Sequence, residues 1–175
     1  MKIGVSSYSF SRLVGSGKMT QLEVVAKTKE MGFDYIEFAG LSVPQGETLE
    51  TFAPKVRETC EAAGLPITNY TIGADFINGS GGDLKAEVER LKGEVRIAKA
   101  LGATGMRHDA TRGFPAEHVG PRSFDAALPL LVRGCRAVTE YAADLGIRTM
   151  VENHGFFCQD SERVEKLANG VDHPN

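Results

Sequence analysis

The chain has 175 residues, a formal net charge of −3, 42% hydrophobic residues and 25% charged residues. This length and composition are typical of one soluble domain with a substantial core, which we predict over residues 1–175. The acidic balance argues against nucleic-acid binding, and no apolar run is long enough to cross a membrane. The three cysteines lack CxxC spacing, so they indicate neither a disulfide framework nor a zinc site. Because the N-terminal residues read as a strand and not as a signal peptide, we expect a cytoplasmic protein.

Five short segments, each followed by polar residues, have the character of β-strands. These predicted strands cover residues 3–10, 33–38, 66–72, 104–109 and 148–151. The last one is largely apolar and is expected to be buried. Residues 171–175 are predicted to form a turn that leads into another strand.

Helices are predicted between the strands, because apolar residues recur there at intervals of three and four. They run from Thr20 to Gly32, from Thr48 to Ala63, from Asp83 to Gly102, from Ser123 or Asp125 to Gly146, and from Ser161 to Ala168, with Asn169-Gly170 closing the last one. Pro129 fits the fourth helix only if it lies in the first turn. Residues 78–82 are predicted to be a loop without a phosphate-binding role, since the Lys-Ser/Thr of a P-loop is missing.

The order of these elements predicts the architecture. Strands and helices alternate strictly, and a glycine marks the same helix-to-strand junction at positions 32, 64, 102 and 146. Such alternation favours a parallel sheet with helices outside it. A doubly wound sheet normally carries a glycine-rich phosphate turn after its first strand, and none is present here. We therefore predict an α/β fold of the (β/α)8 TIM-barrel type, as a partial barrel of about five βα units that is incomplete at its C-terminal end.

Polar side chains follow every predicted strand, where the active site of an α/β barrel lies. The candidates are Tyr8, Glu37, Arg107, His108, Asp109, Glu152 and His154. Alternation along a strand places Glu152 and His154 on one face, where a carboxylate and an imidazole can hold a divalent metal or move protons. A polar ring with aromatic neighbours suits a small polyhydroxylated substrate. Structural alternatives remain open: ion pairs for Glu37 and Asp109, a salt bridge or substrate contact for Arg107, and a hydrogen-bonded rim position for His108.

Three stretches resemble the xylose isomerase-like TIM barrels. They are Lys2-Ile3-Gly4-Val5-Ser6, Gly32-Phe33-Asp34-Tyr35-Ile36-Glu37 and Val151-Glu152-Asn153-His154-Gly155. That group includes sugar phosphate isomerases/epimerases, ketose 3-epimerases, inosose dehydratases and endonuclease IV. The resemblance implies that Glu152 is a ligand of a divalent metal and also an acid/base. The metal would be manganese, with magnesium, cobalt or zinc as alternatives, and the remaining ligands would lie beyond Asn175.

By this resemblance we expect a metal-dependent isomerase or epimerase of a sugar, sugar phosphate or cyclitol, with catalytic Glu152 and substrate-binding Tyr8, Glu37, Arg107, His108 and His154. Cys158 stands where ketose 3-epimerases tend to carry a second glutamate. An inosose dehydratase-like lyase is one alternative, and an endonuclease IV-like repair enzyme is a weaker one because the chain is acidic. The chain could also be an inactive barrel fragment or a binding module. We expect the 175 residues alone to be catalytically silent, to bind manganese poorly and to self-associate.

Overall fold

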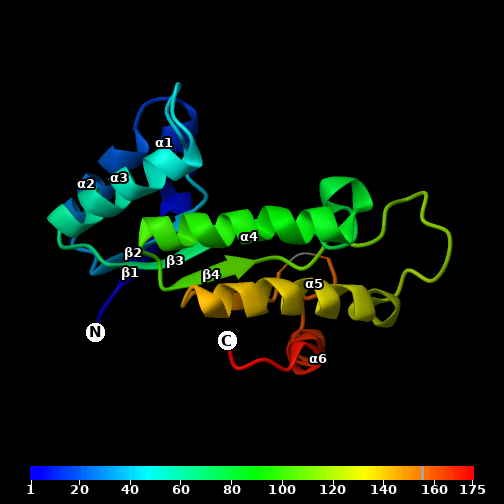
Figure 1. The fold of residues 1–175 in the computed structure, drawn as a ribbon. Helices are drawn as coiled ribbons and strands as arrows, with labels where there is room; N and C mark the ends of the chain where they lie inside the picture. The colour runs from blue at the N-terminus through cyan, green and yellow to red at the C-terminus, as the bar shows by residue number, and fades with distance from the viewer. Residues whose placement is uncertain (155) are drawn as a thin grey trace. The chain divides into compact units, whose positions relative to one another are not determined.

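A computed structural model describes residues 1–154 and 156–175, and the strands in this part of the chain form one sheet (Figure 1). The strands are β1 (Gly4–Ser6), β2 (Tyr35–Ala39), β3 (Ile67–Ile72), β4 (Gly105–His108) and β5 (Arg148–Val151). Their order in the sheet is β1-β2-β3-β4-β5, and the β1–β2 and β2–β3 pairs are parallel. A doubly wound sheet reverses its strand order at a switch point, whereas barrel strands follow the chain. The sequential order therefore confirms the barrel-type prediction.

The chain forms two compact units, each made of two stretches of sequence. One unit comprises Met1–Thr71 with Arg96–Met106, and the other comprises Ile72–Val95 with Arg107–Asn175. Because the cut runs through β4, the strand contributes Gly105 and Met106 to the first unit and Arg107 and His108 to the second. Each unit is described below by itself.

The first unit contains the short helices η1 (Ser7–Phe10) and α1 (Ser11–Gly15), followed by α2 (Gln21–Glu30) and α3 (Leu49–Ala62). The predicted strand over residues 3–10 is wrong after Ser6, because the Ser6 side chain accepts a hydrogen bond from the Tyr8 backbone N–H and starts a 3-10 turn. Thr20 and Glu23 form the predicted capping box of α2. Helices α2 and α3 pack against each other and bury Val24, Val25 and Phe52.

The second unit is built around α5 (Phe124–Asp144), with α6 (Ser161–Val171) packed against it (Figure 1). Helix α4 (Leu84–Leu101) begins in this unit after the single turn η2 (Gly79–Gly82), where a loop was expected. The predicted end of the last helix at Asn169-Gly170 is wrong. The helix continues to Val171 and ends at Asp172, which has left-handed backbone angles. Gly170 is needed inside it, since a Cβ there would lie 2.6 Å from a Val132 methyl group.

Two further expectations are corrected by the second unit. Pro129 is the sixth residue of α5 and so lies beyond the first turn. The helix tolerates this proline because it is exposed and lies close to the start of the helix. The i−4 carbonyl that loses its partner belongs to Asp125, which is also exposed and so can hydrogen-bond to solvent. Strand β5 is not buried: its residues alternate between exposed and half-buried, because it lies at one edge of the sheet.

The last residues approach the free edge of β5, as the predicted turn toward another strand requires. The Thr149 N–H donates to the Asn175 backbone carbonyl at 3.1 Å, and the Asn175 side-chain amide donates to the Ile147 carbonyl at 2.9 Å. These bonds hold Asn175 beside β5. In residues 1–154 and 156–175, no helix combines the length and apolarity that a membrane span needs.

Candidate active site

Two neighbouring strands end in side chains of opposite charge that meet. Glu152 follows β5 directly, and its carboxylate forms an ion pair with the guanidinium of Arg107 in β4. The Arg107 side chain is 22% exposed, whereas the Glu152 side chain is 45% exposed. The arginine is thus held inside the strand ends, and the carboxylate remains open to a substrate on its solvent side.

Asp109 extends this pair into a cluster of four residues. Its Oδ1 accepts hydrogen bonds from Arg107 Nη1 at 3.3 Å and from His154 Nδ1 at 3.0 Å. Because an ionised carboxylate only accepts, His154 Nδ1 is the donor of the 3.0 Å bond. We call Arg107, Asp109, Glu152 and His154 the strand-end cluster. Gly155, which closes the motif in the sequence, lies outside the described residues.

The strand-end cluster brings together three of the predicted site residues: Arg107, Glu152 and His154. Asp109 was a strand-end candidate with an ion pair as its structural alternative, and it does pair with Arg107. Its central position was missed, although a signal existed in the sequence. Residues two apart on a strand share a face, so Arg107 and Asp109 had to point the same way.

The other two rim candidates, Tyr8 and Glu37, lie in the first unit. Glu37 of β2 is in register with Ser6 of β1 and with Asn69 of β3. The Asn69 side-chain amide donates a long hydrogen bond of 3.5 Å to the Glu37 carboxylate. Glu37 therefore has an amide partner, whereas the structural alternative considered from the sequence was an ion pair. Tyr8 in η1 is exposed and lines a cavity of about 290 Å³ together with Gln21 and Ser42.

His108 differs from the other candidates because it is almost completely buried. Only 1% of the residue is exposed, and its Nδ1 lies 2.8 Å from the backbone carbonyl of Asp109. It follows Arg107 in β4, so its side chain leaves the strand on the other face from Arg107. There it meets the edge of the Phe76 ring, with 5.8 Å between ring centroids. Burial lowers the pKa of His108 below its ordinary value, and the imidazole is therefore neutral near pH 7.

The family resemblance implies a divalent metal, and the described residues can be tested for it. Oxygen-loving cations need several carboxylate, carbonyl or imidazole ligands that converge on one point. Among residues 1–154 and 156–175, no group of three His, Cys, Asp or Glu side chains converges in this way. In addition, the Glu152 carboxylate is engaged by the Arg107 guanidinium. These residues by themselves do not fit a metal centre.

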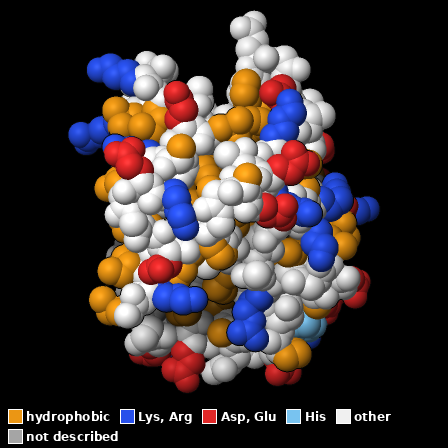
Figure 2. Space-filling view, turned by 90° about the vertical axis from the view of Figure 1, so that its left-hand side faces the viewer, with side chains coloured by type: hydrophobic (Ala, Val, Ile, Leu, Met, Phe, Trp, Pro, Cys, Tyr) orange, Lys and Arg blue, Asp and Glu red, His pale blue; other side chains and the backbone are white. Residues whose placement is uncertain are grey.

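Charge on the surface is mixed. On the face drawn in Figure 2, acidic and basic side chains are interspersed, with apolar side chains between them. This pattern differs from the basic stripe that follows the phosphates in a duplex-binding protein.

Comparison with known proteins identifies the family. A family model described as xylose isomerase-like TIM barrel matches residues 25–175. The chain therefore belongs to the xylose isomerase-like TIM barrel family, and its five-stranded parallel sheet with outer helices is a partial barrel of that type. A search of curated protein sequences found no match.

Several solved structures share the fold. A probable 3-DHS dehydratase from Bacillus anthracis, involved in petrobactin synthesis, superimposes with a TM-score of 0.74 at 22% identity, over 100% of this chain and 61% of that one. An L-ribulose 3-epimerase gives 0.73 at 18% identity, over 100% and 59%. The 3-keto-D-glucoside 4-epimerase YcjR from E. coli gives 0.64 at 22% identity, over 86% and 55%. The chain thus spans between 55% and 61% of the length of these relatives.

Proposed function

We propose that this protein acts as an isomerase or epimerase on a small sugar, sugar phosphate or cyclitol. The observation that carries the proposal is the Glu152–Arg107 pair at the ends of two neighbouring strands, where barrel enzymes place their chemistry. Similar structures support the proposal, because solved structures of this fold include epimerases that act on sugars.

The proposed reaction is a proton transfer at the carbon next to a carbonyl. The Glu152 carboxylate takes the proton, and the electron pair of the broken C–H bond moves into the substrate to form an enediolate. The negative charge gathers on the former carbonyl oxygen, to which the Arg107 guanidinium donates hydrogen bonds. Return of the proton to the former carbonyl carbon, while the hydroxyl proton moves from one enediolate oxygen to the other, gives an isomer. Delivery of a proton by a second acid to the opposite face of the first carbon gives an epimer.

Three of the remaining candidates, His154, Tyr8 and Glu37, have a proposed role in substrate binding, whereas the buried His108 has none. His154 is oriented by Asp109 and lies in the same cluster as the reacting pair, so it is placed to hydrogen-bond a sugar hydroxyl. Tyr8 and Glu37, which lie in the first unit, are proposed to bind substrate hydroxyl groups. Cys158 is buried, and burial raises the pKa of its thiol, so it cannot replace the carboxylate that ketose 3-epimerases tend to carry there. This favours a substrate other than a simple ketose.

A divalent metal, with manganese as the first candidate, remains part of the proposal for Glu152. The described residues do not form its site alone, so no step above depends on it. Calorimetric titration with manganese chloride tests this part directly. If Glu152 is a ligand, Glu152→Gln weakens whatever manganese affinity the protein has by at least roughly tenfold. An affinity that Glu152→Gln leaves unchanged contradicts the assignment.

A dehydratase is the second candidate, because one of the similar structures is a probable dehydratase. The first step would be the same proton abstraction, followed by loss of a hydroxyl group from the next carbon as water. The product then carries a new double bond instead of a rearranged carbonyl, so NMR of the product mixture separates the two reactions.

The central test is hydrogen exchange in deuterium oxide. A full-length version of the protein is incubated with a panel of ketoses, ketose phosphates and inososes, and deuterium at the carbon next to the carbonyl is measured by NMR. We expect incorporation with at least one substrate and a loss of about 10² to 10⁴-fold in Glu152→Gln. Glu165→Gln, an exposed change in α6, is the matched control and should keep the rate. Equal rates in the two variants would contradict a catalytic role for Glu152.

A further inference from the structure

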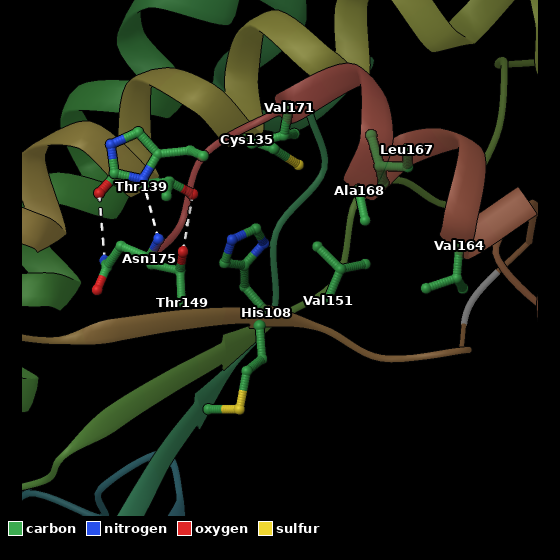
Figure 3. A pocket seen from close by; sticks show the side chains of 12 residues that line it. His108, Cys135, Thr139, Thr149, Val151, Val164, Leu167, Ala168, Val171 and Asn175 are labelled. Atoms are coloured by element: carbon green, nitrogen blue, oxygen red, sulfur yellow. Dashed lines mark hydrogen bonds between the residues drawn. The ribbon is translucent and has the colours of Figure 1, made fainter.

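A cavity of about 140 Å³ lies in the second unit on the helix-covered side of β5 (Figure 3). Residues from β5, α5 and α6 line it, together with His108 from β4 and the last residues of the chain. Its wall is mainly apolar, with Val151, Leu167 and Val171 among the lining residues. No Asp, Glu, Lys or Arg is found among the described residues of the lining. The volume is similar to the ~150 Å³ of an engineered apolar cavity that binds benzene.

Most polar groups in this lining already have partners within the chain. The Thr139 and Thr149 hydroxyl oxygens lie 2.7 Å apart and share a hydrogen bond. The Asn175 amide donates to the carbonyls of Ile147 and Thr139, and the Asn175 backbone N–H donates to His173 Nδ1 at 3.1 Å. Figure 3 shows those bonds that join lining residues gathered at one end of the cavity, beside His108. They hold the wall in place.

His108 adds a further hydrogen-bonding atom to the lining. The Asp109 carbonyl can only accept, so His108 Nδ1 carries the hydrogen of the 2.8 Å bond, and Nε2 of the neutral ring is an acceptor. No partner for Nε2 is found among residues 1–154 and 156–175. The residue is 1% exposed, and its ring is held edge-on by Phe76, so it cannot turn toward solvent without repacking. The His108 ring borders a largely apolar cavity, and a donor placed in that cavity would satisfy its Nε2 acceptor.

We propose that this cavity binds a small neutral molecule with an apolar body and one hydroxyl group, of about the size of phenol, which donates its hydrogen bond to His108 Nε2. The size of the cavity limits the ligand to roughly one ring. The uncharged lining disfavours ions, because a charge would lose its hydration without gaining a counter-charge. The His108 acceptor favours a ligand with a donor over a purely apolar one.

This site is separate from the proposed reaction. His108 and Arg107 are consecutive in β4 and leave the strand on opposite faces, as do Val151 and Glu152 around the end of β5. The cavity therefore shares β4 and β5, but no side chain, with the strand-end cluster. Binding of a phenol here is expected even if the protein has no isomerase activity.

A pair of ligands of similar shape tests the hydrogen bond. Phenol and fluorobenzene are titrated into the protein, and binding is followed by calorimetry and by the ¹⁵N resonance of His108 Nε2. We expect phenol to bind at least tenfold more tightly than fluorobenzene and to shift the Nε2 resonance. Equal affinities, or an Nε2 resonance that phenol leaves unmoved, would show that a water molecule or nothing occupies the acceptor and would overturn the proposal.

Three variants locate the site. His108→Phe keeps a ring of similar shape but removes the acceptor, so phenol should lose its tenfold preference. His118→Phe changes a histidine that stacks on Phe114 outside the cavity, and it should keep that preference. Ala168→Leu retains His108 and fills part of the cavity, so both ligands should bind at least tenfold more weakly. It keeps the proposal testable if His108→Phe fails to fold. Phenol binding that Ala168→Leu leaves unchanged would place the ligand elsewhere.

Discussion

The strand-end cluster and the His108 cavity are built from the same two strands but surround their side chains very differently. In the cluster, Arg107 and Glu152 form an ion pair at a partly exposed rim, where both charged groups stay partly hydrated. On the other face, His108 is covered by helices and stays neutral. The chain changes from one environment to the other between consecutive residues. The difference teaches that a polar residue at the end of a strand joins the rim only if the alternation of side chains along the strand points it to that face.

The comparison predicts that changes on the covered face act on stability and changes in the cluster act on turnover. Leu167 of α6 is 1% exposed and lines the cavity, so Leu167→Ala removes buried methyl groups and enlarges a space that already exists. We expect unfolding to become easier by about 2–5 kcal/mol. Urea unfolding followed by circular dichroism measures this. Any sugar turnover per folded molecule should stay unchanged, and a selective loss of turnover would break the comparison.

Arg107→Gln should have the opposite profile. The variant loses the charge that faces Glu152 and the donor proposed for the substrate oxyanion, so turnover should fall about 10²-fold. Stability should change by less than about 1 kcal/mol, since exposed ion pairs contribute little. Exchange rates in deuterium oxide and urea unfolding are measured on the same sample. An Arg107→Gln protein that exchanges substrate hydrogen normally would make the Arg107–Glu152 pair structural.

Asp109→Asn tests the role assigned to Asp109 at the centre of the strand-end cluster. Asp109 contacts Arg107 and His154 but is not proposed to touch the substrate, so it acts by positioning. We expect a fall in turnover of about tenfold, smaller than for Arg107→Gln. The His154 Nδ1 hydrogen should also lose its protection in NMR spectra. If that signal is unchanged while turnover falls, the effect does not pass through His154.

The smallest expected effect is a loss of folding stability at acidic pH. Burial lowers the pKa of His108, with Arg107 and Arg90 acting in the same direction and the Asp109 carbonyl and carboxylate opposing them. The unfolded chain binds a proton at the ordinary pKa, whereas the folded chain resists it. The stability is therefore complete above about pH 6.5 and falls as the pH drops toward the lower folded pKa, by at most about 1.4 kcal/mol per pH unit. His108→Phe should flatten this slope in urea unfolding between pH 7 and pH 5, while His118→Phe should not.

Local signals in the sequence determined most of the elements. Gly32, Gly64, Gly102 and Gly146 have positive φ values of 82°, 60°, 79° and 69°, the left-handed conformation that ends a helix and that glycine adopts without strain. The Thr20 cap, with Glu23 three residues later, predicted the start of α2 within one residue. Alternation of strands and helices was sufficient to predict the order β1-β2-β3-β4-β5, because consecutive strands of a barrel must be neighbours.

Only the tertiary structure decided the surroundings of each residue. The pattern of residues 148–151 is apolar enough for a buried strand, but the edge position leaves β5 half exposed. Asn169-Gly170 has the composition of a helix end, yet contact with Val132 uses Gly170 inside α6. Arg107, His108 and Asp109 are equally polar in the sequence. Their separation into an open charged cluster and a buried neutral acceptor depends on which face the helices cover, and covering helices come from sequence positions more than fifteen residues away.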